Sequence, residues 1–126
     1  MKKAVLALSL LLGIALLSLW NLRHLEKLTD ELTAGIIAVR QHCREGSFDE
    51  AERTLNKALD RWLGSDGYTH IFIRHSEIDA ASDIFYDLRG DILAGDSESA
   101  GADAEKLLYH LQSIRSMERI SIKSIF

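Results

Sequence analysis

The chain of 126 residues contains no proline and a single cysteine, and both scarcities narrow its fold. Average usage near ~5% would give roughly six prolines in a chain of this length. A sequence that avoids proline and is rich in Leu, Ala, Glu and Ile is typical of a mostly helical protein. The single cysteine, Cys43, excludes an intramolecular disulfide. We interpret Cys43 as a buried free thiol, with an intermolecular disulfide as the alternative.

Acidic residues are missing from the first 20 positions, whereas the remainder holds 19 acidic and 13 basic residues, a net charge of −6. This negative remainder argues against binding to nucleic acid, because phosphates would be repelled. The sequence also lacks a nucleotide-binding loop, a zinc-ligand spacing and a nucleophile elbow. We therefore expect no nucleic-acid partner, no cofactor and no enzymatic activity.

A long apolar run is present instead. No charged residue occurs from Ala4 to Leu22, a stretch of 19 residues. At about 1.5 Å per residue, such a helix is long enough to cross a bilayer. Trp20 lies where an interfacial anchor is expected, and Lys2 and Lys3 favour an N-terminus on the cytoplasmic side.

A cleaved signal peptide is the alternative interpretation of this run, but the residues around Ser18 fit a cleavage site poorly. We expect an uncleaved anchor in the cytoplasmic membrane, crossed once. Residues 1–3 are then cytoplasmic, residues 4–22 span the membrane, and residues 23–126 form an extracytoplasmic domain.

Apolar residues at helical spacing predict four helices. The first continues the membrane segment outward and ends at Gly46, which is placed as a left-handed residue. Ser47 and Glu50 match a capping box for a second helix, which stops in the turn from Gly64 to Gly67. The predicted stripes are Leu25, Leu28, Leu32, Ile36, Val39 and Cys43; Phe48, Ala51, Leu55, Ala58, Leu59 and Trp62; Ile71, His75, Ile78, Ala81, Phe85, Leu88 and Ile92; and Ala100, Ala104, Leu107, Leu108, Leu111 and Ile114.

The third helix is expected to end near Gly95, with a turn from Gly95 to Gly101 and Asp96 or Ser97 as the cap of the fourth. The tail "RISIKSIF" alternates apolar and polar residues, which predicts a short extended segment. The fold class is therefore all-α, an N-terminal transmembrane helix continuing into a small antiparallel four-helix bundle.

The two junctions "GSFDEA" at Gly46 and "GDSESA" at Gly95 are alike and lie 49 residues apart. Each follows one helix and opens the next. The 34-residue period of tetratricopeptide repeats is absent, so the likeness does not predict such an array.

Several motifs in a fixed order resemble those of small bacterial membrane proteins grouped as domain of unknown function 4363. The shared features are a lysine-led N-terminus, one membrane helix, a "G-x-[FW]-x-x-A" junction at Gly46, Trp62, an "H-x-E-I-D" segment of His75, Glu77, Ile78 and Asp79, and an ending of Ser124, Ile125 and Phe126. The chain departs from the pattern at Tyr68 and Phe72, where relatives often carry a further tryptophan, and at Ser124, where they often carry asparagine. The resemblance implies a topology and no assigned activity.

The segment "HSEID" supplies the candidate site residues His75, Glu77 and Asp79. On a helix, His75 and Asp79 lie on one side together with apolar residues, which favours a hydrogen-bonded polar pair at the edge of the core. The alternatives are a metal half-site, which needs His42, His70 or His110 as further ligands, and an acid–base pair.

Two charge stripes flank this segment. Asp79, Asp83, Asp87 and Asp91 recur every four residues, as do Arg53, Lys57 and Arg61. A hairpin centred near Asp66 would bring Arg53 to Asp79. Mutual salt bridges are the favoured interpretation, and a cation site or a basic partner is the alternative.

Two classes of function follow. The first is a non-enzymatic accessory module, a single-pass anchor that presents a helical bundle to an integral membrane or envelope protein. The second is an envelope sensor that binds a metal or ligand through His75 and nearby carboxylates. Trp62, His75, Glu77, Asp79 and Arg53 are the interaction or structural candidates, and a homo-oligomer is a further option.

Overall fold

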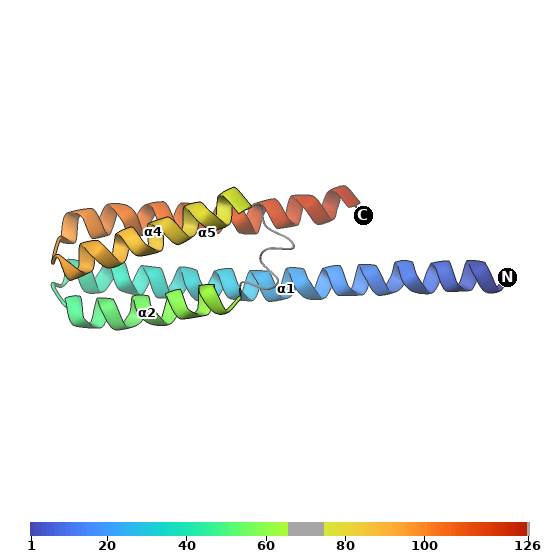
Figure 1. Ribbon diagram of the computed structural model, residues 1–126, viewed down its shortest axis with the longest axis horizontal. Helices are drawn as coiled ribbons and strands as arrows, with labels where there is room; N and C mark the ends of the chain where they lie inside the picture. Colours follow the sequence, from blue (N-terminus) through green and yellow to red (C-terminus); the bar gives the residue numbers. More distant parts are fainter. Residues whose placement is uncertain (66–74, 126) are drawn as a thin grey trace.

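The computed structural model describes residues 1–65 and 75–125, with the side chains of all of these except residues 21, 22, 75 and 117–125. In the described ranges the chain forms four helices and no strand (Figure 1). They are α1 (Lys2–Arg44), α2 (Phe48–Gly64), α4 (His75–Leu93) and α5 (Ser97–Ile125). The all-α prediction is therefore confirmed.

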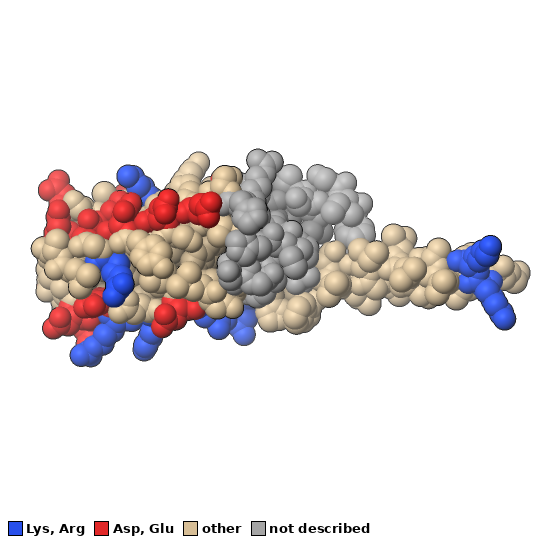
Figure 2. Space-filling model, in the orientation of Figure 1, with Lys and Arg blue, Asp and Glu red and all other residues tan. Residues whose placement is uncertain are grey.

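Helix α1 has two parts with opposite surroundings. Its large apolar side chains from Val5 to Leu19 are between 48% and 67% exposed, whereas Leu25 and Leu28 are almost fully buried. Among the described residues, α1 is the helix whose length and composition suffice to cross a membrane. Figure 1 shows this N-terminal part extending beyond the bundle. Over the span itself the surface carries no charge up to the lysines at its start (Figure 2).

The rest of α1 packs with the other helices into an antiparallel bundle. Helix α1 contacts α2 and α5, and α4 contacts α5 and α2, so each helix has two neighbours. The apolar stripes meet along the bundle axis, as their helical spacing requires. The buried core consists of Leu25, Leu28, Leu32, Ile36, Val39, Cys43, Ala51, Leu55, Ala58, Leu59, Trp62, Ile78, Ala81, Phe85, Leu88, Ile92, Ala100, Ala104, Leu107, Leu111 and Ile114.

Two glycines end helices as predicted. Gly46 has φ +76° and Gly95 has φ +68°, a left-handed conformation that costs other L-residues roughly 1–2 kcal/mol. Asp96 is the cap of α5, because its Oδ1 accepts a hydrogen bond from the Ser99 N–H at 3.1 Å. That backbone hydrogen bond lowers the pKa of the Asp96 carboxyl below its usual value.

The capping box expected at the start of α2 is wrong. Ser47 occupies the N-cap position, but its side chain makes no capping hydrogen bond. Glu50, the second member of the box, instead accepts a hydrogen bond from Arg53 at 3.0 Å. The ion pair one turn along the helix thus replaces the reciprocal cap.

The C-terminal region also differs from expectation. Gly101 lies inside α5, and the backbone of "RISIKSI" remains helical up to Ile125, so the extended tail is wrong. A helix that is already nucleated gains one hydrogen bond with each added residue. An extended tail would need a strand partner, and the described ranges contain none. Ile71, a member of the predicted third stripe, lies outside the described residues.

Candidate functional site

The "HSEID" segment opens α4 and contributes one contact to a neighbouring helix. Glu77 Oε2 lies 3.3 Å from Nδ1 of His110 on α5, and both side chains are half-buried. Asp79 is exposed, while the side chain of His75 lies outside the described residues. The segment therefore links α4 to α5 through Glu77, and the roles predicted for His75 stay predictions.

Trp62 connects α2 to α4, in agreement with its prediction as a core residue. The side chain is 3% exposed, and its indole Nε1 donates a hydrogen bond to Ser82 Oγ at 3.0 Å. The ring also stacks on Phe85, with 6.1 Å between the ring centroids. A buried indole needs such a hydrogen-bond partner, so this contact fixes the register of the two helices.

That register differs from the expected hairpin about Asp66. Because Trp62 is level with Ser82, Arg61 is level with Asp83 and Lys57 with Asp87. Arg53 pairs with Glu50 on its own helix, and both side chains are exposed. The predicted Arg53–Asp79 contact is therefore wrong.

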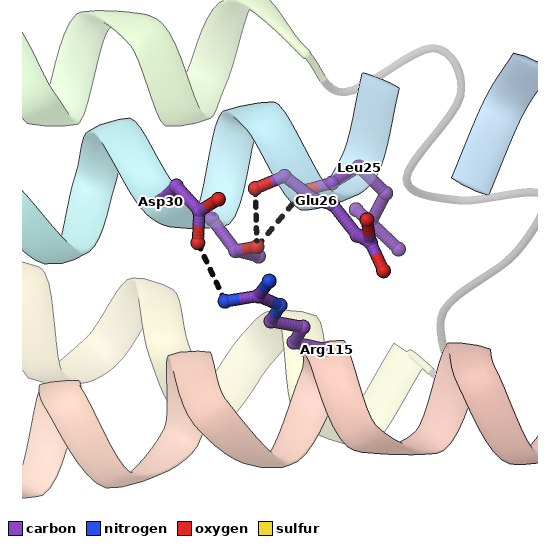
Figure 3. A network of polar contacts seen from close by, with 5 residues as sticks. Leu25, Glu26, Asp30 and Arg115 are labelled. Atoms are coloured by element: carbon purple, nitrogen blue, oxygen red, sulfur yellow. Dashed lines mark hydrogen bonds and ion pairs between the residues drawn. The ribbon is translucent and has the colours of Figure 1, made fainter. Parts of the chain in front are cut away.

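Two ion pairs hold the end of the bundle nearest the apolar span. Arg115 Nη1 on α5 lies 2.6 Å from Asp30 Oδ1 on α1, and Arg61 Nη2 on α2 lies 2.6 Å from Glu31 Oε2 on α1. Figure 3 shows the Asp30–Arg115 contact between the two helices. These pairs join helices that are distant in sequence, so periodicity along one helix did not reveal them.

A buried hydroxyl lies beside the first of these ion pairs. Thr29 is 1% exposed, and its hydroxyl donates to the carbonyl oxygens of Leu25 and Glu26, each at 3.0 Å (Figure 3). The hydrogen bonds stay within α1, which satisfies the polar atom without a partner from another helix. Thr29 is therefore a structural residue of the stripe rather than a reactive group.

An acidic pair lies at the opposite end, where the two helix junctions meet. Ser97 Oγ donates to the Cys43 carbonyl at 3.0 Å, which ties the start of α5 to the end of α1. Burial raises the pKa of Asp91 from 3.8 to about 7, helped by a hydrogen bond with Asp103 and by the charges of Asp103, Asp96 and Asp87. The described residues offer no hydrogen-bond donor to Asp91 Oδ2, which is buried. Protonation of one carboxyl lets it donate to the other.

Cys43 lies close to this pair and is 1% exposed. Burial raises the pKa of its thiol, and the negative charge of Asp91 adds to that effect. A protonated, buried thiol is a poor nucleophile and metal ligand. The predicted buried free cysteine is thus observed.

An open groove of about 250 Å³ lies between α1 and α2. It is lined by Glu31, Leu32, Gly35, Thr54, Lys57, Ala58 and Arg61. The Glu31–Arg61 ion pair already joins the two charges at its rim. Within the described residues, no three His, Cys, Asp or Glu side chains come together in a way that could hold a metal ion.

The chain matches a known protein family. A family model described as a domain of unknown function, DUF4363, matches residues 19–125. The match covers the whole bundle and the last residues of the apolar span. No curated protein and no solved structure matches the chain.

Proposed function

We propose that this chain, which belongs to the DUF4363 family, is a single-pass membrane-anchored accessory module whose helical bundle binds a membrane or envelope protein outside the cytoplasm. The observation that carries the proposal is the single helix α1, 43 residues or about 65 Å long, which is apolar and exposed at one end and buried in the bundle at the other. An unbroken helix of this kind presents the bundle at a fixed height above a bilayer.

The outer face of α4 offers a surface for the partner. Asp79, Asp83 and Asp87 are exposed there and recur every four residues, and they form no ion pair with another described side chain. Like charges at this spacing repel one another and weaken the helix. A basic partner surface would relieve that repulsion, so we propose that the partner contacts this acidic ridge. Figure 2 shows that acidic side chains are gathered over the bundle.

Photo-crosslinking in cells tests the proposal with a matched pair of exposed tyrosines. Tyr86 lies between Asp83 and Asp87 on α4 and is 50% exposed, while Tyr109 on α5 is 69% exposed. A photo-reactive phenylalanine analogue in place of Tyr86 should capture a membrane or envelope protein, and the same analogue in place of Tyr109 should not.

The captured band should weaken at least several-fold in the variant Asp79→Asn, Asp83→Asn, Asp87→Asn, because the attraction of the ridge is removed. Raised salt should weaken it as well. Equal capture with and without the three aspartates would reject the ridge as the contact surface. If the only captured protein is a second copy of the chain, the proposed partner is wrong and the surface belongs to a homo-oligomer.

The alternative function is a metal- or ligand-binding sensor of the envelope. The Glu77–His110 contact supports it, because it brings a second imidazole to the segment that begins with His75. Zinc binding by these groups should raise the melting temperature of the protein, as any ligand of the native state does. The rise should disappear in His75→Ala and in His110→Ala, and no rise with zinc would reject the sensor.

A further inference from the structure

The two helix junctions at the far end of the bundle have the same backbone geometry. Ser47 N–H donates to the His42 carbonyl at 2.8 Å, and Asp96 N–H donates to the Asp91 carbonyl at 2.9 Å. The second donor and acceptor each lie 49 residues after their counterparts in the first junction. The left-handed glycines, Gly46 and Gly95, have the same separation. The likeness noticed in the sequence is thus a repeated structure.

The repeat extends along both helices of each hairpin. Among the described side chains of α4 and α5, each of the ten buried residues lies 49 positions after a buried residue on α1, on α2 or at the C-cap of α2. The equivalent pairs are Thr29 and Ile78, Leu32 and Ala81, Ile36 and Phe85, Val39 and Leu88, Cys43 and Ile92, Ala51 and Ala100, Leu55 and Ala104, Ala58 and Leu107, Trp62 and Leu111, and Ser65 and Ile114. A constant offset without insertion over two helices and a turn needs more than a shared helical period, because each turn resets the phase.

The contacts between helices follow the same two-fold relation. Exchanging α1 with α4 and α2 with α5 turns the α1–α2 contact into the α4–α5 contact. The same exchange turns the α1–α5 contact into the α4–α2 contact. The order of neighbouring helices is therefore unchanged by this exchange, although the contact between α1 and α5 is more extensive than the contact between α4 and α2 among the described residues.

We infer that the bundle is a pseudo-dimer of two equivalent helical hairpins, residues 29–65 and 78–114, in which each hairpin covers the apolar face of the other. This inference is independent of the proposed partner. The comparison of the two hairpins also shows which residues the repeated structure does not require. The acidic pair Asp91 and Asp103 is matched in the first hairpin by His42 and Thr54, so the repeat does not require paired carboxylates there.

Grafting one junction onto the other tests the equivalence in the full-length chain. In the first variant, residues 89–103 are replaced by the sequence of residues 40–54, which keeps the 49-residue register. In the control, the same positions receive residues 39–53, which shifts every buried and glycine position by one. The measurement is thermal unfolding in detergent at several pH values between 4 and 8, monitored by circular dichroism.

The in-register graft should keep the helical signal and a cooperative transition, with a melting temperature within about 10 °C of the original protein. The shifted graft should lose the cooperative transition, because it places the glycine one residue past the turn. The in-register graft replaces Asp91 and Asp103 by histidine and threonine, so the gain in stability at low pH that the two carboxyls create should disappear. A graft that unfolds like its shifted control, or a control as stable as the graft, would overturn the inference.

The reciprocal graft, with residues 89–103 in place of residues 40–54, provides a second measurement. It should also keep a cooperative transition, and in addition it carries the acidic pair into the first hairpin. Loss of the cooperative transition in this second graft would overturn the equivalence as well.

Discussion

At Asp91, burial and the neighbouring carboxyls raise the pKa from 3.8 to about 7. The folded protein therefore holds this proton more tightly than the unfolded chain does. The resulting contribution to stability is fully present below pH 3.8 and is lost as the pH rises through about 7. The groups that face Asp91 are Cys43 on α1, Asp96 at the N-cap of α5, Asp103 on α5, and Asp87 on its own helix.

Asp91→Asn removes the charge while leaving a side chain that can donate a hydrogen bond to Asp103. We expect a higher melting temperature than that of the original protein at pH 8 and a flatter pH dependence between pH 4 and pH 7. Thermal melts across that window measure the difference. Asp79→Asn, an exposed change on the same helix, serves as the control and should leave the shape of the pH profile intact.

Trp62 stabilises the contact between α2 and α4 through its hydrogen bond to Ser82. Trp62→Phe keeps an aromatic ring in the core but removes the hydrogen bond to Ser82, which should cost about 1–2 kcal/mol of unfolding free energy. Ser82→Ala should cost about 1 kcal/mol. If the two side chains act through their contact, denaturant titrations of the double variant should show less than the sum of the two losses.

Two glycines with a left-handed backbone, Gly46 and Gly95, can be compared with Gly90, which has a helical backbone inside α4. Gly46→Ala and Gly95→Ala should each destabilise the protein by roughly 1–2 kcal/mol, because alanine is strained at positive φ. Gly90→Ala should stabilise it by about 0.5–1 kcal/mol, since Gly90 lies inside α4 and an added Cβ would meet nothing within 4 Å. Chemical denaturation of the three variants checks these signs, and equal losses at Gly46 and Gly95 agree with the repeated hairpin.

Periodicity was a sound guide to each helix and its buried face, because burial at every third or fourth position depends on one helix alone. The stripe from Leu25 to Cys43 and the breaks at Gly46 and Gly95 were predicted in this way. The capping box at Ser47 and the extended tail were wrong, because each depended on competition with another interaction. Glu50 pairs with Arg53, and the tail continues a helix that has already formed.

The polar contacts between helices were beyond the reach of the sequence. Asp30–Arg115 and Glu77–His110 join residues 85 and 33 positions apart, and they depend on a register that only the packed bundle defines. The hairpin register expected about Asp66 misplaced Arg53 for the same reason. Pairing between helices depends on their relative register, and the spacing of residues along a single helix does not define that register.

For the whole molecule, the proposed topology places the bundle outside the cytoplasmic membrane. Labelling of intact cells with a membrane-impermeant maleimide tests it in a Cys43→Ser background. Ala102→Cys, at an exposed position on α5, should react, whereas Lys2→Cys should not. Reaction at position 2 and not at position 102 would show that the protein has the opposite orientation in the membrane. A mature protein that begins beyond Trp20 would show that the apolar run is removed.

Because α1 passes from the apolar span into the bundle as one helix, the two parts share a rotational phase. Each residue of an α-helix turns the chain by about 100° and advances it by about 1.5 Å. One alanine inserted between His24 and Leu25 would therefore swing the ridge on α4 by about 100° around the helix axis, while hardly lifting it. Seven inserted residues would nearly restore the heading but raise the bundle by about 10 Å. A partner embedded in the same bilayer can thus meet only the side of the bundle that the phase of the span selects.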